Sequence, residues 1–267
     1  MKNTNLTSIS PLDGRYAGKC DPLRNLFSEY GLIHLRTQVE VRWLQFLADH
    51  PGIEGVGPLP PVVNTFLDDL VDKFDRESAQ KVKDIESTTN HDVKAVEYFL
   101  SESFGADQEL GKLRPFLHFA CTSEDINNIS YALMLRRGRD EVLLPALRKI
   151  TGRLSETARL TAEVPMLSRT HGQTASPTTL GKELANVVWR LERQIQLLAN
   201  VPTLAKMNGG SATSMLTSLP TPMSIGQWHQ KHSFSRSALT GTPTRLKSNH
   251  TTGSLSTAML WHALTLF

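Results

Sequence analysis

The chain has 267 residues, of which 39% are apolar and 21% are charged, a composition typical of a globular protein with one large or two smaller domains. The two cysteines, Cys20 and Cys121, are too few for a disulfide framework, so we expect a cytoplasmic location. The first residues lack the continuous apolar stretch of a secretory signal, and no stretch approaches the roughly 18 apolar residues of a membrane span. We therefore expect neither a secreted nor a membrane protein.

Charge is distributed unevenly along the chain. All 26 acidic residues precede Gly210, together with 25 of the 29 basic residues, so this body has a net charge of −1. The remaining segment, 210–267, has four basic residues and no acidic residue. The overall charge of +3 therefore comes from this tail and does not indicate nucleic-acid binding.

The first half of the body has helical periodicity. Apolar residues recur at helical spacing over Phe27–Ala48, and a loop rich in Pro and Gly follows over Pro51–Pro61. A shorter amphipathic helix is predicted over Asn64–Phe74. A further helix is predicted to begin with Asn90 or Asp92 as its cap. Its apolar residues are Val93, Val96, Phe99 and Leu100.

Three helix starts are predicted in the second half. Ser123 is followed by two acidic residues, which are favoured at the positive end of a helix. Long helices are predicted over Glu141–Leu160 and from Pro177, in the first turn, to about residue 198. No strands joined by a hairpin turn are predicted, so the fold class is all-α. The tail is rich in Ser and Thr and is predicted to be irregular and disordered.

Four polar clusters lie at the expected ends of helices, where functional side chains are commonly displayed. Arg15 can hold a phosphate or carboxylate through two parallel hydrogen bonds. His91 and His171 titrate near neutral pH, as general acids or bases do. The clusters are Asp13–Tyr16, Thr88–Asp92, Thr122–Asp125 and Arg169–Gln173.

The residues of these clusters can be interpreted in two ways, as ligand-binding groups or as structural groups such as helix caps. Thr122 and Ser123, with the backbone N–H groups that follow, suit an anion at a helix N-terminus, and Gln173 can donate and accept. Taken singly, each cluster is better explained as structural, for example Ser123 and Asp92 as helix caps. No spacing matches a zinc site, and no glycine-rich phosphate loop is present. Structural roles are assigned to His34, His50 and His118.

The clusters belong to four longer segments, DGRY, TTNHDVKAVEYFL, HFACTSEDINN and SRTHGQTASPTTLGKELAN. In this order and approximate spacing they resemble adenylosuccinate lyases of the fumarase/aspartase superfamily, over about residues 8–208. The HGQ and NHD triplets favour this family over argininosuccinate lyase or fumarase.

The resemblance implies a β-elimination in purine nucleotide biosynthesis, which converts adenylosuccinate to AMP and fumarate and SAICAR to AICAR and fumarate. A base removes a proton from the succinyl β-carbon, and an acid, matched by His171, protonates the departing nitrogen. His91 would assist through a phosphate contact or as a partner of the acid. No metal or organic cofactor is implied. The implied substrate-binding residues are Arg15, Tyr16, Asn90, His91, Asp92, Thr122, Ser123, Thr170 and Gln173.

The resemblance also implies an architecture. Residues 1–112 match an N-terminal helical domain, 113–208 match part of a central bundle of long helices, and 209–267 form an aberrant tail. The family is a homotetramer whose sites combine several subunits. Its base is a serine in a loop of pattern SSxMPxKxN that belongs after residue 267. We therefore expect an incomplete enzyme, with little or no activity from this chain alone.

The tail is interpreted as an out-of-frame translation, because the resemblance ends abruptly at Lys206–Gly209. Suitable codons can be chosen for Ala212–Gly226 and for Leu239–Thr251. When both are read from the third base of the first codon, they give NFNAHVAAYPDVDW and DWNPYTTQIEPHD. Both strings resemble the family's continuation and restore acidic residues. A single missing nucleotide near Gly209–Gly210 accounts for both.

Two other interpretations stay open. One is a different fumarate-releasing lyase, such as argininosuccinate lyase, which comparison of the two substrates would reveal. The other is a non-catalytic helical fragment that binds nucleotide or associates with intact lyase subunits, which would co-purify with such subunits without activity of its own.

Overall fold

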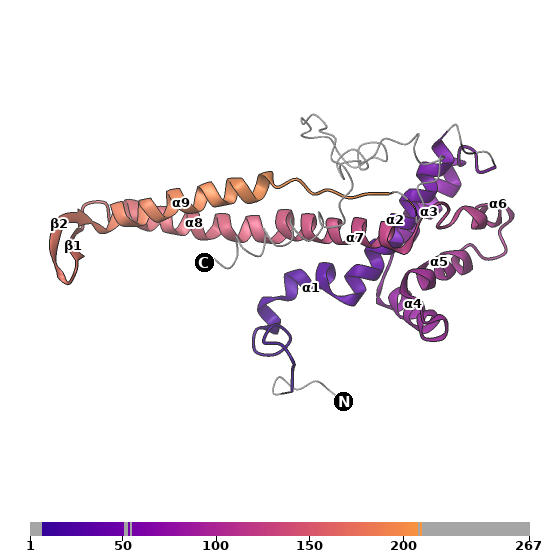
Figure 1. The fold of residues 1–267 in the computed structure, drawn as a ribbon, viewed down its shortest axis with the longest axis horizontal. Coiled ribbons are helices and arrows are strands. Elements are labelled where there is room, and N and C mark those ends of the chain that lie inside the picture. The colour runs from indigo at the N-terminus through magenta and orange to yellow at the C-terminus, as the bar shows by residue number, and fades with distance from the viewer. Residues whose placement is uncertain (1–6, 51–52, 54, 208, 210–267) are drawn as a thin grey trace. The chain divides into compact units, whose positions relative to one another are not determined.

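The computed structural model describes residues 7–50, 53, 55–207 and 209 of the chain, so the predicted disorder of the tail 209–267 lies outside the described residues apart from Gly209. The described residues are mainly helical, with one small two-stranded sheet (Figure 1), and the predicted all-α class is confirmed. In chain order the elements are η1 (Ala17–Lys19), α1 (Asp21–Phe27), α2 (Glu29–Asp49), α3 (Pro61–Asp72), α4 (Arg76–Thr89), α5 (Asp92–Ser103), α6 (Gln108–Gly111), η2 (Arg114–Phe116), α7 (Ser123–Arg137), the π-helical η3 (Gly138–Leu143), α8 (Leu144–Leu160), β1 (Pro165–Thr170), β2 (Gln173–Thr179) and α9 (Leu180–Asn200).

The chain divides into two compact units. Among the described residues, the first comprises those up to Leu135 and those from Thr203 onward, and the second comprises residues 136–202. These units are defined by packing within this chain. The predicted domains, 1–112 and 113–208, concern the organisation of the family's whole subunit and stay a prediction.

Helix α2 is buried on every side within the first unit. Residues 35–48 are all buried, and three apolar clusters surround the helix. Leu67 of α3 and Leu100 of α5 belong to the largest cluster, and Ile126 of α7 belongs to the second. A helix buried all round is expected to be apolar all round. Helix α2 nevertheless carries the buried polar side chains Arg36, Thr37, Gln38, Glu40, Arg42 and Gln45.

These polar side chains connect α2 to its neighbours, because a buried polar group needs a hydrogen-bond partner. Arg42 pairs with Asp68 of α3. Arg36 reaches the start of α5, and Glu40 reaches the loop before α7. Helix α2 therefore fixes the positions of elements that carry predicted site residues.

The second unit contains η3, the helices α8 and α9, which pack side by side, and the hairpin of β1 and β2 that joins them (Figure 1). The backbones are in close contact at Gly181, where an added Cβ would lie 2.3 Å from the carbonyl oxygen of Ala158 and 2.6 Å from the Cα of Ala162. Thr179 caps α9, accepting a hydrogen bond from the backbone N–H of Lys182 at 3.2 Å. The large apolar residues left exposed on the two helices are Ile150, Leu160, Val187, Trp189 and Leu197.

Most predicted helices are present. The helix expected over Asn64–Phe74 is α3, and the helix expected over Glu141–Leu160 is η3 continued by α8. The helix expected over Phe27–Ala48 begins at Glu29, because Ser28 accepts a hydrogen bond from the backbone N–H of Gly31 at 3.3 Å and caps it. No described helix has the length and apolar character needed to span a membrane.

Two predictions about residues 165–180 were wrong. The segment contains an antiparallel hairpin, and α9 begins at Leu180 rather than at Pro177. Pro177 lies in β2 opposite Leu167. A two-stranded sheet has only edge strands, where a residue without an N–H is tolerated. The turn was missed because His171–Gly172 is not among the usual hairpin signals, such as Asn-Gly or Asp-Gly.

Candidate active site

Asn90, His91 and Asp92 form the junction between α4 and α5. Asn90 ends α4 in the left-handed conformation, with φ of 52°, which Asn tolerates better than most residues. His91 has an extended backbone, and its Nδ1 accepts a hydrogen bond from the backbone N–H of Lys94 at 3.1 Å. The prediction that Asn90 or Asp92 caps α5 is therefore wrong, because His91 holds that position and Asp92 is the first helical residue.

Arg36 fixes this junction from the core. Its side chain is only 4% exposed, and it donates to Oδ2 of Asp92 at 2.6 Å and to Oδ1 of Asn127 at 2.9 Å. Burial of Asp92 opposes ionisation, but the backbone N–H of Val93 and the Arg36 guanidinium outweigh it, so the pKa of Asp92 is held below its ordinary value. The α4–α5 junction is thereby joined to both α2 and α7.

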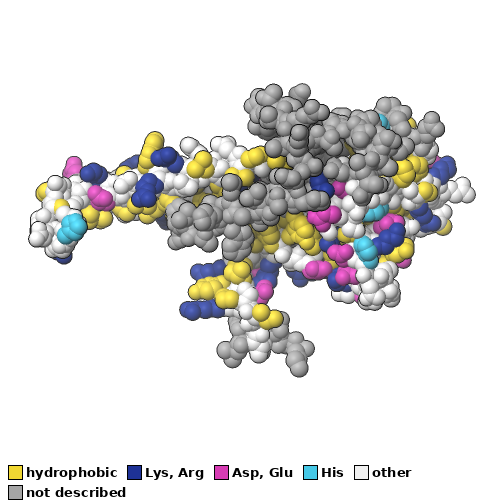
Figure 2. Space-filling view, in the orientation of Figure 1, with side chains coloured by type: hydrophobic (Ala, Val, Ile, Leu, Met, Phe, Trp, Pro, Cys, Tyr) yellow, Lys and Arg dark blue, Asp and Glu magenta, His cyan; other side chains and the backbone are white. Residues whose placement is uncertain are grey.

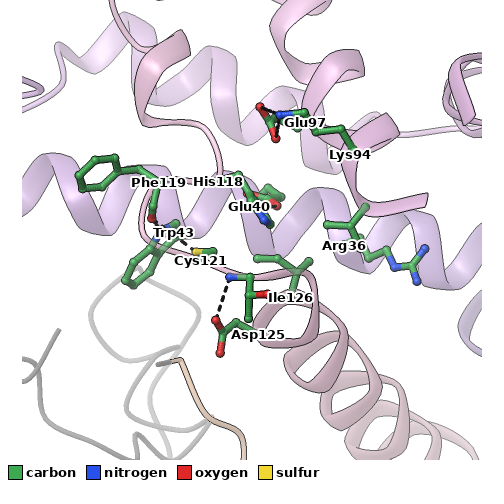
Figure 3. A network of polar contacts seen from close by, with 12 residues as sticks. Arg36, Glu40, Trp43, Lys94, Glu97, His118, Phe119, Cys121, Asp125 and Ile126 are labelled. Atoms are coloured by element: carbon green, nitrogen blue, oxygen red, sulfur yellow. Dashed lines mark hydrogen bonds and ion pairs between the residues drawn. The ribbon is translucent and has the colours of Figure 1, made fainter. Parts of the chain in front are cut away.

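Helix α7 begins at the predicted Ser123, and a pair of side chains in its first turns holds a distant segment. Asp125, labelled in Figure 3, accepts hydrogen bonds on Oδ2 from the backbone N–H groups of Thr122 (3.0 Å) and Gly209 (2.9 Å). Asn128 accepts from the N–H of Lys206 at 2.9 Å and donates to its carbonyl at 3.1 Å. This Asp125–Asn128 clamp holds Lys206 and Gly209 against the start of α7.

A buried pair joins α2 to the loop before α7 (Figure 3). Oε1 of Glu40, whose side chain is completely buried, lies 2.6 Å from Nδ1 of His118. Its other oxygen, Oε2, has no hydrogen-bond partner among the described residues. His118 adopts a left-handed φ of 56°. Local sequence spacing could not reveal this pair, because its members lie 78 residues apart.

The Glu40–His118 pair binds its proton tightly. Burial opposes a charged His118, but the hydrogen bond and the negative charge of Glu40 outweigh burial and raise the pKa of His118 above its ordinary value. Burial also raises the pKa of Glu40, although His118 counteracts this in part. Both shifts favour the form of the pair that keeps a proton.

We expect the free energy of unfolding to decrease as pH rises above about 6.5, through the pKa of His118 in the native state. The native pair binds its proton more tightly than the unfolded chain, so this stabilisation is complete below the unfolded pKa. Urea unfolding at about pH 6 and pH 8.5 measures the decrease. His118→Gln, which cannot titrate, is the matched control. An equal decrease in both proteins would contradict the prediction.

Arg15 and Tyr16 lie in an exposed turn before η1. The guanidinium carbon of Arg15 is 5.4 Å from the centroid of the Tyr16 ring. The carbonyl of Tyr16 accepts hydrogen bonds from the N–H groups of Lys19 and Cys20. The turn therefore presents a cation and a phenol to solvent, where a ligand can reach them.

His171 lies at the tip of the β1–β2 hairpin. Thr170 pairs with Gln173, so His171 and Gly172 are the two residues of the turn. Their φ values of 49° and 76° are both left-handed, as a type I′ turn requires. All four residues are exposed. The turn therefore displays the imidazole to solvent, at the expense of a left-handed backbone conformation that His adopts less readily than Gly.

The predicted site residues belong to both units. Within the first unit, Arg36 joins Asp92 to α7, the helix at whose start Thr122 and Ser123 lie. In the described part of the chain, no group of three or more His, Cys, Asp or Glu is arranged to hold a metal ion. The first unit holds Arg15, Tyr16, Asn90, His91, Asp92, Thr122 and Ser123, and the second holds Thr170, His171 and Gln173.

Proteins of known sequence include close relatives of this chain. A family model described as lyase matches residues 14–262, and so continues past Asn208, where the resemblance was predicted to end. Adenylosuccinate lyases of Haemophilus influenzae and Escherichia coli K12 are 51% and 49% identical to it over 232 residues. These alignments cover 86% of this chain and 50% of each relative. The chain thus spans about half the length of the curated relatives it matches.

Solved structures share the fold. A fumarate lyase from Mesorhizobium sp. BNC1 matches with a TM-score of 0.58 and 24% identity, over 75% of this chain and 44% of that one. A 3-carboxy-cis,cis-muconate lactonizing enzyme from Pseudomonas putida matches with a TM-score of 0.56 and 23% identity, over 73% and 43%. Because the family model matches most of its length, the chain belongs to the lyase family.

Proposed function

We propose that this chain is part of an adenylosuccinate lyase, which eliminates fumarate from adenylosuccinate and from SAICAR. The observation that carries the proposal is the 51% identity to the Haemophilus influenzae adenylosuccinate lyase across 86% of this chain. A homologous fold alone would not distinguish the substrates of this family.

In the proposed reaction, a base takes the proton from the succinyl β-carbon, and the electron pair left behind forms the new C=C bond. The C–N bond breaks, and His171 protonates the departing nitrogen. The exposed position of His171 at the hairpin tip supports this role, because the acid must come within hydrogen-bond distance of the leaving group. Thr170 and Gln173, which pair at the base of the turn, would contact substrate beside it.

The other substrate-binding roles are assigned to residues of the first unit. Arg15, exposed and cationic, suits a phosphate or carboxylate. Thr122 and Ser123 begin a helix, whose N-terminal N–H groups favour an anion. The further proposed binding residues are Tyr16, Asn90, His91 and Asp92.

Assembly of the intact enzyme as a cytoplasmic homotetramer belongs to the same proposal. Supporting it, α8 and α9 leave large apolar side chains exposed, including Trp189 (64%) and Ile150 (52%), and apolar side chains are visible along these helices in Figure 2. Exposed apolar faces of this kind mark interaction surfaces. They also favour the alternative of a non-catalytic fragment that associates with intact subunits.

We also propose that one nucleotide is missing near the Gly209–Gly210 codons. The absence of acidic residues after Gly209 supports this. Sequencing the gene decides it, and a gene in which no one-base shift yields the two family-like strings would refute it.

The activity is tested on the frame-restored gene, in which one nucleotide is inserted at the Gly209–Gly210 codons and translation runs to the next stop codon. Its purified product is expected to release fumarate from adenylosuccinate and SAICAR, and not from argininosuccinate. Preference for argininosuccinate would favour another lyase of the superfamily. Co-purification with intact lyase subunits without activity would favour the non-catalytic fragment.

A further inference from the structure

The hairpin that carries His171 has an extra residue in β2, between its base and its turn. The register of the two strands shifts there by one residue, so that Ser168 of β1 alone faces two residues of β2, Ala175 and Ser176. An insertion of this kind is a β-bulge, which bends its strand and increases the local twist. Bulges are frequent beside active sites, where they redirect a side chain.

The prolines of the hairpin fit this shifted register. The N–H of Leu180 donates to the carbonyl of Val164 at 3.0 Å, so these two residues form a hydrogen-bonded pair. Such pairs alternate with non-hydrogen-bonded pairs along antiparallel strands, which places Pro165 and Pro177 where no ladder hydrogen bond is needed. Counted from the two-residue turn without a bulge, Pro177 would face Met166 in a hydrogen-bonded pair and lose a ladder bond. The bulge therefore allows the turn and Pro177 to belong to one ladder.

The base of the hairpin is fixed to the helices, whereas its tip projects into solvent (Figure 1). At the base, the N–H of Gly181 donates to the carbonyl of Thr161 at 3.0 Å, and the hydroxyl of Thr178 donates to Oε1 of Glu183 at 2.8 Å. Beyond the bulge, residues 169–174 are all exposed. The direction of the tip therefore depends on the backbone between base and turn, and the bulge lies in this part of the backbone.

We infer that the Ala175–Ser176 bulge is a positioning element, which sets the direction in which the hairpin presents His171. Its catalytic consequence rests on the proposed function. A general acid must come within hydrogen-bond distance of the leaving nitrogen, and a misplacement of about 1 Å can lower a rate about 10²-fold. The bulge acts through the number of backbone residues in β2, and its side chains need not touch the substrate.

Deletion of Ser176 removes the bulge and leaves the rest of the ladder in register. Ser168 would then face Ala175 alone, Pro177 would keep its partner in β1, and the turn would be unchanged. In nuclear magnetic resonance of the 267-residue chain, residual dipolar couplings of the N–H groups of residues 169–174 report the direction of the tip relative to α8. We expect the deletion to change these couplings and the matched control Ser176→Ala to preserve them. Unchanged couplings after the deletion, or equal changes in both variants, would overturn the inference.

A nuclear Overhauser effect between Thr170 and Gln173 shows whether the shortened hairpin still forms, because these residues pair beside the turn. Deletion of Ala175 gives a ladder of the same length and is the second variant. We expect the hairpin to persist in at least one of the two deletion variants. Loss of the hairpin in both would overturn the inference, because the bulge would then be required for folding rather than for direction.

The catalytic consequence is tested in the frame-restored enzyme. Deletion of Ser176 is expected to lower kcat for adenylosuccinate about 10²-fold and to change KM less, whereas Ser176→Ala should match the parent enzyme. In the His171→Asn background the same deletion is expected to cost much less, because the two changes act through one imidazole. A similar loss in both backgrounds would overturn the positioning role.

The two measurements distinguish this inference from the proposed function. If the parent enzyme releases no fumarate, the proposed function fails, while the dipolar couplings still decide whether the bulge directs the tip that carries His171. If the couplings change and kcat does not, the proposed function stands and the positioning role is overturned.

Discussion

His171→Asn is expected to lower kcat for adenylosuccinate by about 10²–10⁴-fold in the frame-restored enzyme. An amide cannot transfer a proton to the departing nitrogen, so the C–N bond would have to break without acid catalysis. Steady-state measurement of fumarate release gives kcat and KM separately. A kcat within about threefold of the parent enzyme would remove His171 from the role of acid.

The hairpin makes Asn an informative replacement. Asn-Gly is a preferred pair for a type I′ turn, and His171 and Gly172 both have the left-handed backbone that this turn requires. His171→Asn should therefore keep or improve the hairpin while removing the imidazole. His171→Ala is the comparison, because it removes the imidazole and also strains the turn. Thermal unfolding of both variants shows whether a loss of activity comes from the missing imidazole or from a less stable fold.

Gly181→Ala is expected to destabilise the α8–α9 pair by about 3 kcal/mol. The added Cβ would lie 2.3 Å from the Ala158 carbonyl oxygen and 2.6 Å from the Cα of Ala162. Both are backbone atoms, which cannot move aside as a flexible side chain can. The base of the hairpin would shift too, because the N–H of Gly181 donates to the carbonyl of Thr161 at 3.0 Å. The substitution should therefore also lower activity through the position of His171.

Gly152→Ala is the matched control within the same unit. Gly152 lies inside α8, and an added Cβ meets nothing within 4 Å. Alanine should stabilise this helix by about 1 kcal/mol, the opposite sign to Gly181→Ala. Amide hydrogen exchange over α8 and α9 measures both changes. Equal protection in Gly181→Ala and the parent chain would show that the helices are not in close contact at this position.

The helical body was predictable because its apolar residues recur at helical spacing. Val93, Val96, Phe99 and Leu100 are all buried, as expected from that spacing. Helix α4 was not predicted, and it has only two buried residues, Ala79 and Val82, so its apolar signal is weak. The hairpin was missed for a different reason: its turn places His where Asn or Asp is usual.

The candidate residues were predictable from local clusters and family resemblance, but their surroundings were not. The cap at His91 competes with Asn90 and Asp92, which are both better capping residues by general preference. Arg36 pairs with Asp92, and this pairing favours His91 as the cap. Arg36 lies 56 residues earlier in the chain than Asp92. Glu40 and His118 are likewise distant in sequence. Such pairs are established by packing around α2, and no local pattern contains them.

The Asp125–Asn128 clamp sets a boundary for shortened versions of the protein. A chain that stopped at Asn200, where α9 ends, would leave the clamp without the three hydrogen bonds it makes to Lys206 and Gly209. It would also remove Met207 from the two apolar clusters that it packs against. A stop codon directly after Gly209 keeps all of these contacts. An expression clone should therefore end no earlier than residue 209, although the last described helix already ends at Asn200.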